Sequence, residues 1–563
     1  MKRFAFFLLL SCLLLSAGIS PFGLNAQPGA GNPAPGNIIL TQRANLNLVY
    51  GGPTRAEGRS YNFTPIFFIY PDGKLDKAGA EALLASLDIQ PLLNDNYGTA
   101  VVVNPTGDTY DAAVDFDAFV ELFNQFRGPG NLKLVGFGQG ATFVNQVLAP
   151  KAAGQVAGIL TVGGKPGKSV DAVGVPAYVA GKGAAKVAKP YQKAIATHAD
   201  EPLLRVVVNP ADVSLKEIFA NAWKEVLGRN YRYNNYRHTH YEGTRFGEYG
   251  AFELEPYLDC EALGIQRNIV EFPAGFRQNT PDGPKYLWYE YWPKELLEGA
   301  PEHSVPVVVL LHGNTNDPRT QAETSGFLQV AGEERFFVVE MEWQGTPNYQ
   351  ALGHDGIESV LYILLEKYPQ LDPARIYAHG LSAGSMTATA LGIKKSHVFA
   401  AVGGNSGALF TGRLIGPFPT FETIWNEATQ KRGAVETAYC SVFGTMDNVV
   451  PYMKPDNWKG NSYLNAWNAY EQMNGMAVVD QMDFSLDPVF GQVLRDRETI
   501  RTNKGEGIVM ETGQLYKGDI PLIRLVAVVD YGHWNFMPAA RVAWDFFKHY
   551  SRDPETKKLI YHP

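Results

Sequence analysis

The sequence has few cysteines, few charges and no long apolar stretch beyond its first thirty residues. Its 563 residues include 3 cysteines, and charged residues make up 19% of the chain against 45% hydrophobic residues. Disordered, collagenous and coiled-coil proteins have very different compositions, so these classes are excluded. We therefore expect a globular protein, and at about 150 residues per domain the chain is long enough for two to four domains.

Basic clusters are also missing. The chain has 49 Lys and Arg against 57 Asp and Glu, which gives a net charge of -8, and no stretch of it is strongly basic. A protein that follows a phosphate backbone needs a basic face, so we expect no nucleic-acid partner. After the first thirty residues no segment has 18 consecutive apolar residues, so we expect no membrane span in the mature chain.

The first 26 residues have the pattern of a signal peptide. Lys2 and Arg3 precede an apolar stretch at residues 4–15, and small residues before position 27 suit a cleavage site. We predict export, with the mature protein either secreted or periplasmic. A membrane anchor is one alternative, but the apolar stretch is short for a bilayer. A lipoprotein modified at Cys12 is another, which the apolar residues after Cys12 disfavour.

Two later stretches of the chain share one pattern, which indicates an internal repeat. In each stretch a proline leads an apolar strand, and a later strand enters a Gly-x-x-x-Gly turn followed by a helical pattern. The first strands begin at Pro65 and Pro306, and the turns occupy residues 136–140 and 380–384. Apolar, β-branched strands that alternate with helices are typical of parallel sheets covered by helices. We therefore predict two tandem α/β domains with mostly parallel sheets.

The predicted limits follow from these patterns and from the composition between them. They are a signal peptide at 1–26, a flexible Gly- and Pro-rich linker at 27–44, a first domain at 45–228, an irregular connector at 229–264 and a second domain at 265–563.

Metal ligands and disulfides receive little support from the sequence. His238, His240 and Glu242 alternate within the connector, but their spacing matches no established metal site, so a polar loop is favoured. We predict no metal and no organic cofactor. Once the leader is removed, Cys260 and Cys440 are the remaining cysteines. They form either one disulfide or two separate buried thiols, the second being favoured.

The turn at residues 380–384 carries the strongest chemical signal. It reads Gly-Leu-Ser-Ala-Gly, follows an apolar strand at 375–379 and precedes a helical pattern at 385–391. In a nucleophile elbow a serine stands on a tight strand-to-helix turn, and small residues two positions before and after it leave room for the backbone. We therefore predict that Ser382 is a nucleophile.

A serine hydroxyl needs a base to accept its proton and an acid to orient that base. In this kind of fold both follow the serine in the order acid, then histidine. His533 comes directly after an apolar strand and is the best base, whereas the other later histidines occupy surface or terminal positions. Asp447 lies just past the end of the strand around 440–444 and is the best acid, with Asp530 as its rival. Backbone N–H groups of Ala383 and Asn314 are the predicted oxyanion donors.

These residues resemble the secreted polyhydroxybutyrate depolymerase and feruloyl esterase group of α/β-hydrolases. The resemblance implies that Ser382, Asp447 and His533 are nucleophile, acid and base, and that the substrate is an acyl or aryl ester of a polysaccharide or a polyester. The loop after His312 lacks further glycines common in that group, which leaves the second oxyanion donor open. The matching motifs are Leu311-His312-Gly313, the turn around Ser382, Phe443-Gly444-Thr445-Met446-Asp447 with Val450-Pro451-Tyr452, and Gly532-His533-Trp534.

Aromatic residues near these motifs are candidates for substrate contact. We expect Trp534, His312 and Trp343 to contact the substrate, although a loop-shaping role is favoured for His312. The stretch 457–475 contains Trp458, Tyr463, Trp467 and Tyr470, which form either a helix core or the lining of a cleft.

The first domain keeps the glycines of the turn but lacks the chemical groups. Gly138 stands where the serine belongs, Ala184 stands at the position of the acid, and no histidine occurs between residues 202 and 229. We interpret this domain as a degenerate, non-catalytic α/β-hydrolase-like domain. For the whole chain we predict an exported serine esterase, with a serine peptidase and a non-catalytic polymer-binding protein as alternatives.

Overall fold

The computed structural model divides the chain into two compact units. Unit 1 comprises Met1–Asn235 and Tyr241–Leu258, and unit 2 comprises Tyr236–His240 and Asp259–Pro563. The predicted signal peptide and His238, His240 and Glu242 lie outside the residues that the structure describes. Those residues are 39–43, 46–51, 65–96, 98–125, 130–198, 201–233, 246–247, 253–256, 258–272, 285–314, 316, 318–345, 349–409, 435–502 and 508–563.

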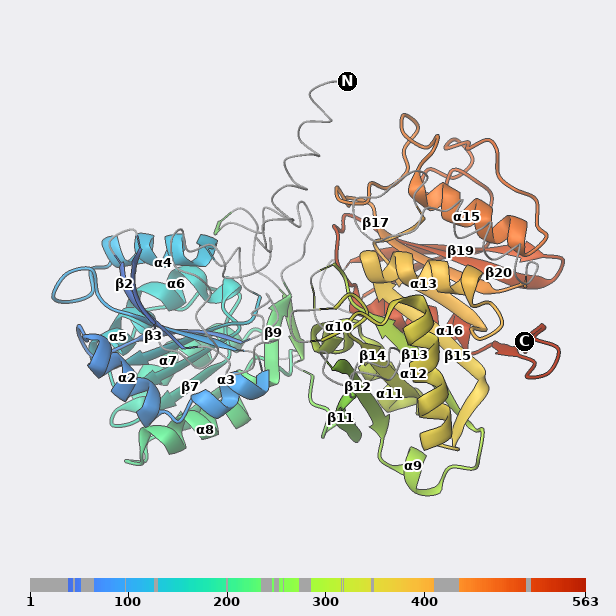
Figure 1. The fold of residues 1–563 in the computed structure, drawn as a ribbon. Helices are drawn as coiled ribbons and strands as arrows, with labels where there is room; N and C mark the ends of the chain where they lie inside the picture. The colour runs from blue at the N-terminus through green and yellow to red at the C-terminus, as the bar shows by residue number, and fades with distance from the viewer. Residues whose placement is uncertain are drawn as a thin grey trace. The chain divides into compact units, whose positions relative to one another are not determined.

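Unit 1 is built on one twisted sheet whose central strands are parallel (Figure 1). The first two strands are antiparallel to their neighbours, and all later pairs are parallel. The predicted linker is wrong at its end, because residues 39–43 pair as the edge strand. In spatial order the strands are β1 (Ile39–Arg43), β2 (Leu46–Gly51), β4 (Thr99–Val103), β3 (Ile66–Tyr70), β5 (Leu132–Phe137), β6 (Gly158–Val162), β7 (Ala177–Ala180) and β8 (Val206–Asn209).

Helices cover both faces of this sheet because its strands are apolar on both sides. The residues of β3, β4 and β5 are buried throughout, as in parallel sheets packed between helix layers. One core contains side chains of α2 (Lys77–Ser86), α3 (Gln90–Asn96) and α8 (Leu215–Glu225). The other contains side chains of α4 (Val114–Gln125), α6 (Ala149–Ala152) and α7 (Ala184–Ile195).

The predicted irregular connector contains two paired strands. These strands, β9 (Asn230–Tyr233) and β10 (Glu253–Pro256), are antiparallel. The buried Lys133 of β5 donates from Nζ to the Asn230 carbonyl at 2.5 Å, and Arg232 donates to the carbonyls of Val156 and Gly174. Burial lowers the pKa of the Lys133 amine well below its usual range. These side chains fasten the start of the connector to the body of unit 1.

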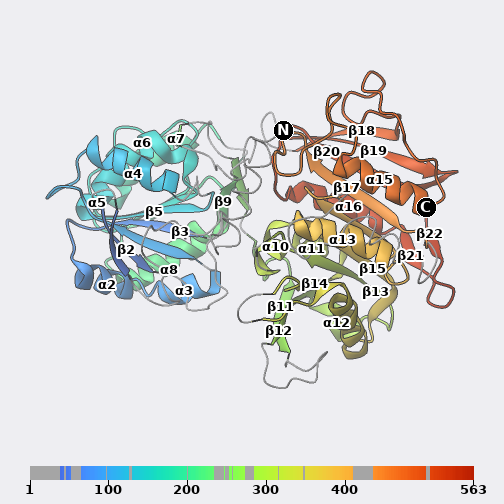
Figure 2. The same ribbon diagram turned by 45° about the horizontal axis from the view of Figure 1, so that its top comes forward.

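Unit 2 repeats the strand order of unit 1 and extends it. Figure 2 shows its sheet running from the green strands through yellow to the red ones. The pairs from β14 to β20 are parallel, which confirms the predicted fold class. In spatial order the strands are β11 (Ile265–Phe272), β12 (Tyr286–Pro293), β14 (Phe337–Met341), β13 (Val305–Leu311), β15 (Leu371–Leu381), β16 (Ala401–Asn405), β17 (Ala438–Gly444), β20 (Ile520–Val528), β19 (Val509–Lys517) and β18 (Arg495–Arg501).

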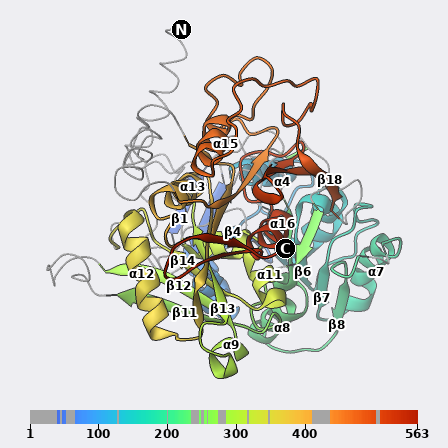
Figure 3. The same cartoon turned by 90° about the vertical axis from the view of Figure 1, so that its right-hand side faces the viewer.

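Two helix layers enclose the sheet of unit 2. One core includes side chains of α12 (Gly353–Lys367), α13 (Ala383–Lys394) and α15 (Ser462–Met473), and the opposite layer holds α10 (Pro318–Thr324), α11 (Phe327–Glu334) and α16 (Met537–Phe547). Figure 3 shows α12 and α11 on opposite sides of β13 and β14. A short α9 (Glu295–Gly299) and a terminal hairpin, β21 (Tyr550–Arg552) with β22 (Leu559–Tyr561), complete the described elements.

Two alternatives left open by the sequence are decided by burial. Tyr463, Trp467 and Tyr470 of α15 are buried in the core of unit 2, so they form a helix core, whereas Trp458 precedes α15 and is half-buried, so the alternative stays open for that residue. Cys260 and Cys440 are both free thiols. Burial raises the pKa of Cys440 to about 12 and that of Cys260 to about 11, so both thiols are protonated at neutral pH.

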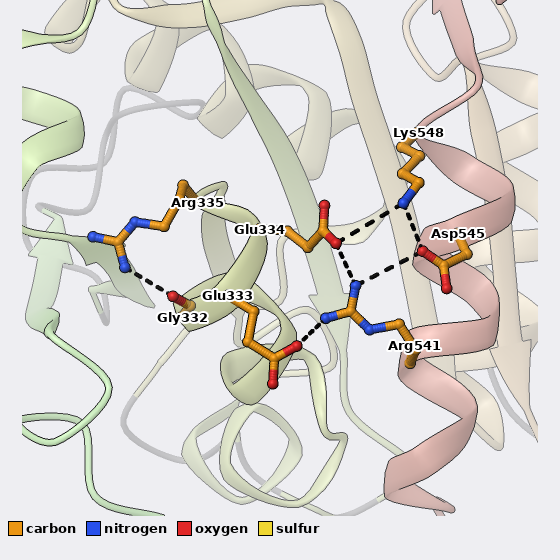
Figure 4. Close-up of polar contacts among 7 residues, drawn as sticks. All are labelled: Gly332, Glu333, Glu334, Arg335, Arg541, Asp545 and Lys548. Atoms are coloured by element: carbon orange, nitrogen blue, oxygen red, sulfur yellow. Dashed lines mark hydrogen bonds and ion pairs between the residues drawn. The ribbon is translucent and has the colours of Figure 1, made fainter.

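The end of α11 contacts α16 through charged side chains and through an aromatic pair. The ring of Phe336, two residues after α11, stacks on that of Trp544 of α16 with centroids 4.0 Å apart. Arg541 of α16 binds Glu333 and Glu334 of α11, with Lys548 and Asp545 beside them (Figure 4). Exposed ion pairs contribute about 0–1 kcal/mol each and an aromatic pair about 0.5–1.5 kcal/mol, so each of these contacts adds little by itself.

A buried histidine stands three residues before the predicted nucleophile. The ring of His379 in β15 lies 4.8 Å from that of Phe327 and 6.4 Å from that of Phe547, and within the described residues neither of its nitrogens has a hydrogen-bond partner. Desolvation lowers the pKa of His379 to about 3. The folded protein therefore keeps this ring neutral across the physiological range.

This lowered pKa predicts a loss of stability in mild acid. Because the unfolded chain takes up a proton near pH 6.5 and the folded chain does not, His379 lowers the free energy of unfolding by about 2 kcal/mol between pH 7 and pH 5. His379→Leu should remove this part of the pH dependence, whereas His562→Gln, at an exposed position, should not. Urea unfolding with hydrogen exchange read on β15 peptides measures the difference, and equal slopes for the two variants would contradict the prediction.

Candidate functional site

Ser382 stands on a sharp turn between β15 and α13. Its backbone has φ 53° and ψ -115°, a left-handed conformation that non-glycine residues rarely adopt. The flanking glycines are needed for space: a Cβ on Gly384 would lie 2.0 Å from the Leu311 carbonyl oxygen, and one on Gly380 would lie 2.3 Å from Gly384. The Ser382 N–H donates to the Asn405 carbonyl at 2.9 Å, which fixes the turn against the neighbouring strand.

The structure brings the three predicted side chains together in one chain of contacts. His533 Nε2 lies 2.8 Å from Ser382 Oγ, and His533 Nδ1 lies 2.8 Å from Asp447 Oδ2. His533 is 3% exposed and Asp447 is 5% exposed, whereas Ser382 is partly exposed. With a carboxylate acceptor at Nδ1, the neutral ring carries its proton there and leaves Nε2 free to accept the serine proton.

Backbone contacts hold the acid in place. Asp447 Oδ1 accepts hydrogen bonds from the N–H groups of Val449 and Val450, at 2.8 and 2.9 Å. These bonds use one carboxylate oxygen and leave the other for His533. Its rival Asp530 is exposed, and its N–H donates to Thr445 Oγ1. Asp447 is thus the carboxylate that the imidazole contacts.

The loops that carry acid and base are joined along their backbones. The N–H of Thr445 donates to the Val528 carbonyl at 3.0 Å, and that of Met446 donates to the Tyr531 carbonyl at 2.9 Å. A Cβ on Gly444 would lie 2.2 Å from the Tyr531 oxygen, so the two loops pack closely. The distance between Asp447 and His533 is therefore set by backbone contacts as well as by their own hydrogen bond.

The other histidines after Ser382 lie in different contacts. His397 Nε2 is 2.8 Å from Glu358 Oε1, and His549 Nδ1 is 2.6 Å from the carbonyl of His562.

The described part of the chain has no cluster of three or more His, Cys, Asp or Glu side chains that could hold a metal ion. No helix within it is long and apolar enough to cross a membrane.

The loop after β13 passes directly beside the elbow. The carbonyls of Leu311 and His312 face Gly384, and Asn314 is exposed in the following turn. Ala383 begins α13, so its backbone N–H is among the helix's first amides, which lack intrahelical acceptors. The two predicted oxyanion donors thus lie on the first turn of α13 and on the loop after β13, which passes beside the elbow.

The predicted substrate contacts need a correction. His312 is 0% exposed; its Nδ1 lies 2.8 Å from the Gly313 carbonyl and its Nε2 lies 3.3 Å from Glu342 Oε1. Trp343 is buried and donates from Nε1 to the His312 carbonyl at 3.0 Å. Trp534 is buried as well. A substrate cannot reach the His312 ring in this conformation, so the prediction of contact is wrong and the loop-shaping role fits its hydrogen bonds.

Several residues around the site escaped the sequence reasoning. Asn405 supplies the carbonyl that binds the Ser382 N–H, and Glu342 binds both His312 and the N–H of Gly345. Asn535 lies buried two residues after His533. The signal that could have pointed to these residues is their position, because each is a polar residue at the end of an apolar strand or next to a motif.

Three features decide the fold of unit 2. They are the elbow between β15 and α13, the chain order Ser, Asp, His, and the strand order β11-β12-β14-β13-β15-β16-β17-β20. Unit 2 has the α/β-hydrolase fold. No family model and no curated protein matches the sequence.

Solved structures of esterases and of a hydrolase are similar to about half of the chain at low sequence identity. An acetyl xylan esterase from Aspergillus awamori is 12% identical, with 50% of this chain and 99% of that one covered and a TM-score of 0.34. An S-formylglutathione hydrolase from Agrobacterium tumefaciens is 12% identical, with coverages of 51% and 95% and a TM-score of 0.33. A feruloyl esterase module from Clostridium thermocellum is 11% identical, with coverages of 54% and 92% and a TM-score of 0.31.

Unit 1 has an elbow of the same shape without a nucleophile. Gly138, the first residue of α5 (Gly138–Phe143) and the residue directly after β5, has φ 49°, close to the value at Ser382. The carboxylate of Asp72 takes the space of the missing side chain, because a Cβ on Gly138 would lie 2.2 Å from Asp72 Cγ. Asp72 Oδ1 accepts the Gln139 N–H at 2.8 Å. This amide corresponds to that of Ala383, the predicted oxyanion donor.

The contact between Asp72 and the empty elbow predicts energetic coupling between two positions. Tyr70 pairs with Gly136 as Leu311 pairs with Gly380, so Asp72 corresponds to Gly313. Gly138→Ala alone should push the Asp72 carboxylate away from the Gln139 N–H. In a double variant that also carries Asp72→Gly, the alanine meets no carboxylate, so its only effect should be the reduced backbone freedom at position 138. Urea unfolding of the four chains should give a coupling of about 1 kcal/mol, and strict additivity would show that the two positions are independent.

Proposed function

We propose that the protein is an exported serine ester hydrolase with its active site in unit 2. The observation that carries the proposal is the continuous contact from Ser382 Oγ through the His533 ring to Asp447, at 2.8 Å on each side. A serine, an imidazole and a buried carboxylate in this order are the arrangement that activates a hydroxyl for acyl transfer.

The proposed chemistry proceeds through an acyl-enzyme. Ser382 Oγ attacks the ester carbonyl while His533 Nε2 takes the hydroxyl proton, and the resulting imidazolium is stabilised by the Asp447 carboxylate. The proton then passes to the departing alcohol as the carbon–oxygen bond breaks. Water attacks the acyl-enzyme with His533 again as the base, which releases the acid and restores the serine.

Two backbone amides are proposed as the oxyanion hole. The N–H of Ala383 is at the N-terminus of α13, where the helix dipole favours negative charge. The N–H of Asn314 belongs to the loop beside the elbow and is the proposed second donor. Because the Ala383 N–H is held in the first turn of α13, it needs little reorganisation as charge develops on the carbonyl oxygen.

The substrate class and the location are proposed from the sequence motifs. Resemblance to depolymerases and feruloyl esterases favours acyl or aryl esters of polysaccharides, or aliphatic polyesters, and the leader at residues 1–26 favours release from the cytoplasm. Unit 1, with Gly138 and Asp72 at its elbow, is proposed to be non-catalytic.

A serine peptidase would use the same triad as an esterase. Turnover measured on matched ester and amide substrates separates the two activities.

The nucleophile is testable by covalent labelling. A fluorophosphonate should label Ser382 in the wild-type chain, as mapped by mass spectrometry, and Ser382→Ala should abolish the label and lower kcat by about 10⁶-fold. Ser385→Ala is the matched control: this serine lies in α13, three residues after Ser382, is buried and donates to the Gly407 carbonyl at 2.9 Å. It should keep the label at Ser382. Retained turnover in folded Ser382→Ala would reject the proposed nucleophile.

Triad residues act as a unit, so their losses should not add. His533→Ala should lower kcat nearly as far as Ser382→Ala does, and combining the two should lower it little further. Esterase assays on the two single variants and the double variant measure this. Losses that multiply in the double variant would show that His533 acts independently of Ser382.

A further inference from the structure

A buried cluster of amide side chains lies directly behind the predicted active site. Asn535 is 0% exposed. Its Nδ2 donates to Gln321 Oε1 at 2.9 Å and to Thr324 Oγ1 at 3.2 Å. Its Oδ1 accepts from Asn405 Nδ2 at 3.3 Å and from Gln321 Nε2 at 3.4 Å. Both polar groups of Asn535 are therefore satisfied by side chains from elsewhere in the fold.

The partners of Asn535 belong to the segments that carry the other active-site groups. Gln321 and Thr324 lie on α10, the helix that follows the loop with Asn314. Asn405 ends β16, and its carbonyl binds the Ser382 N–H. Asn535 itself follows His533 by two residues. One side chain thus connects the base loop, the helix behind the oxyanion loop and the strand that fixes the elbow.

The reciprocal bonds give this cluster a defined geometry. Asn535 and Gln321 each donate to the other, so their amide planes are fixed as a pair, and Thr324 and Asn405 fix which end of the Asn535 amide points to which element. A buried polar network of this kind adds little net stability over an apolar core of equal volume. The network instead fixes the position of the elements that it joins relative to one another.

We propose that Asn535 is a positioning residue that holds the His533 loop in the geometry at which Nε2 reaches Ser382 Oγ. This inference rests on the proposed function, since it concerns the same triad. The base loop is also held by Met446 and by the Tyr531 hydroxyl, which donates to the Asn535 carbonyl at 2.7 Å. Those contacts fix the backbone of the loop, whereas the Asn535 amide links it to α10 and β16.

The test replaces the amide by an apolar group of similar size. In the full chain, Asn535→Leu should lower kcat by about 10- to 100-fold, because displacement of a reacting group by about 1 Å has effects of this size. KM should stay within about twofold, since no substrate contact is removed. The rate of fluorophosphonate labelling at Ser382, per folded molecule, should fall in parallel with kcat.

The chain offers a matched control in Asn474. This asparagine is equally buried in unit 2, and its amide makes two bonds with the backbone of Thr437, at 2.9 and 3.0 Å, away from the triad. Asn474→Leu should lower the stability of unit 2 without lowering kcat per folded molecule. If Asn535→Leu does not fold, Thr324→Val removes one bond of the cluster and should lower kcat by a smaller factor at constant KM.

The outcomes separate this inference from the proposed function. A wild-type chain that is not labelled at Ser382 would overturn both. A labelled wild type with unchanged kcat in folded Asn535→Leu, or in Thr324→Val where the first variant does not fold, would overturn the positioning role alone. An equal loss of kcat in Asn474→Leu would do the same, because the effect would then be a general one of core polarity.

Discussion

The site of unit 2 depends on one constraint, which is that its parallel strands end at the same edge of the sheet. Leu381 pairs with Asn405, Asn405 pairs with Val442, and Gly444 pairs with Val528. In this register β15 ends level with β16, and β17 ends level with β20 two residues further on, so the residues that follow these strands meet at the same rim. Ser382, Asp447 and His533 each follow one of these ends, so residues far apart in the chain converge without a long loop to bring them there.

Much of this arrangement could be predicted because it is encoded locally. Apolar strands, the Gly-Leu-Ser-Ala-Gly turn and the position of His533 after a strand each involve a few neighbouring residues. The fold class and the meeting of Ser382, His533 and Asp447 follow from such short-range patterns together with the rule that parallel strands share an edge. The sequence favoured Asp447 over Asp530, and the coordinates place Asp447 in contact with His533.

Other features depend on pairings that no local pattern encodes. The contact of Asn535 with Gln321 spans 214 residues, and each side chain alone has the appearance of an ordinary polar residue. The burial of His312 and Trp343 depends on Glu342 and on packing of the loop after β13, so aromatic character alone gave the wrong expectation of substrate contact. The paired strands β9 and β10 in the connector were missed for a similar reason, since Lys133, which binds the Asn230 carbonyl, lies far from them in sequence.

The two units share a strand order, but their elbows differ in what occupies the space above the turn. In unit 1 the residue with positive φ is Gly138, and Asp72 fills the space beside it and accepts the exposed Gln139 N–H. This contact constrains which residues the two positions can carry together. A serine side chain at position 138 is accommodated without displacing a neighbour only where position 72 carries no carboxylate, so the identities of the two residues depend on each other.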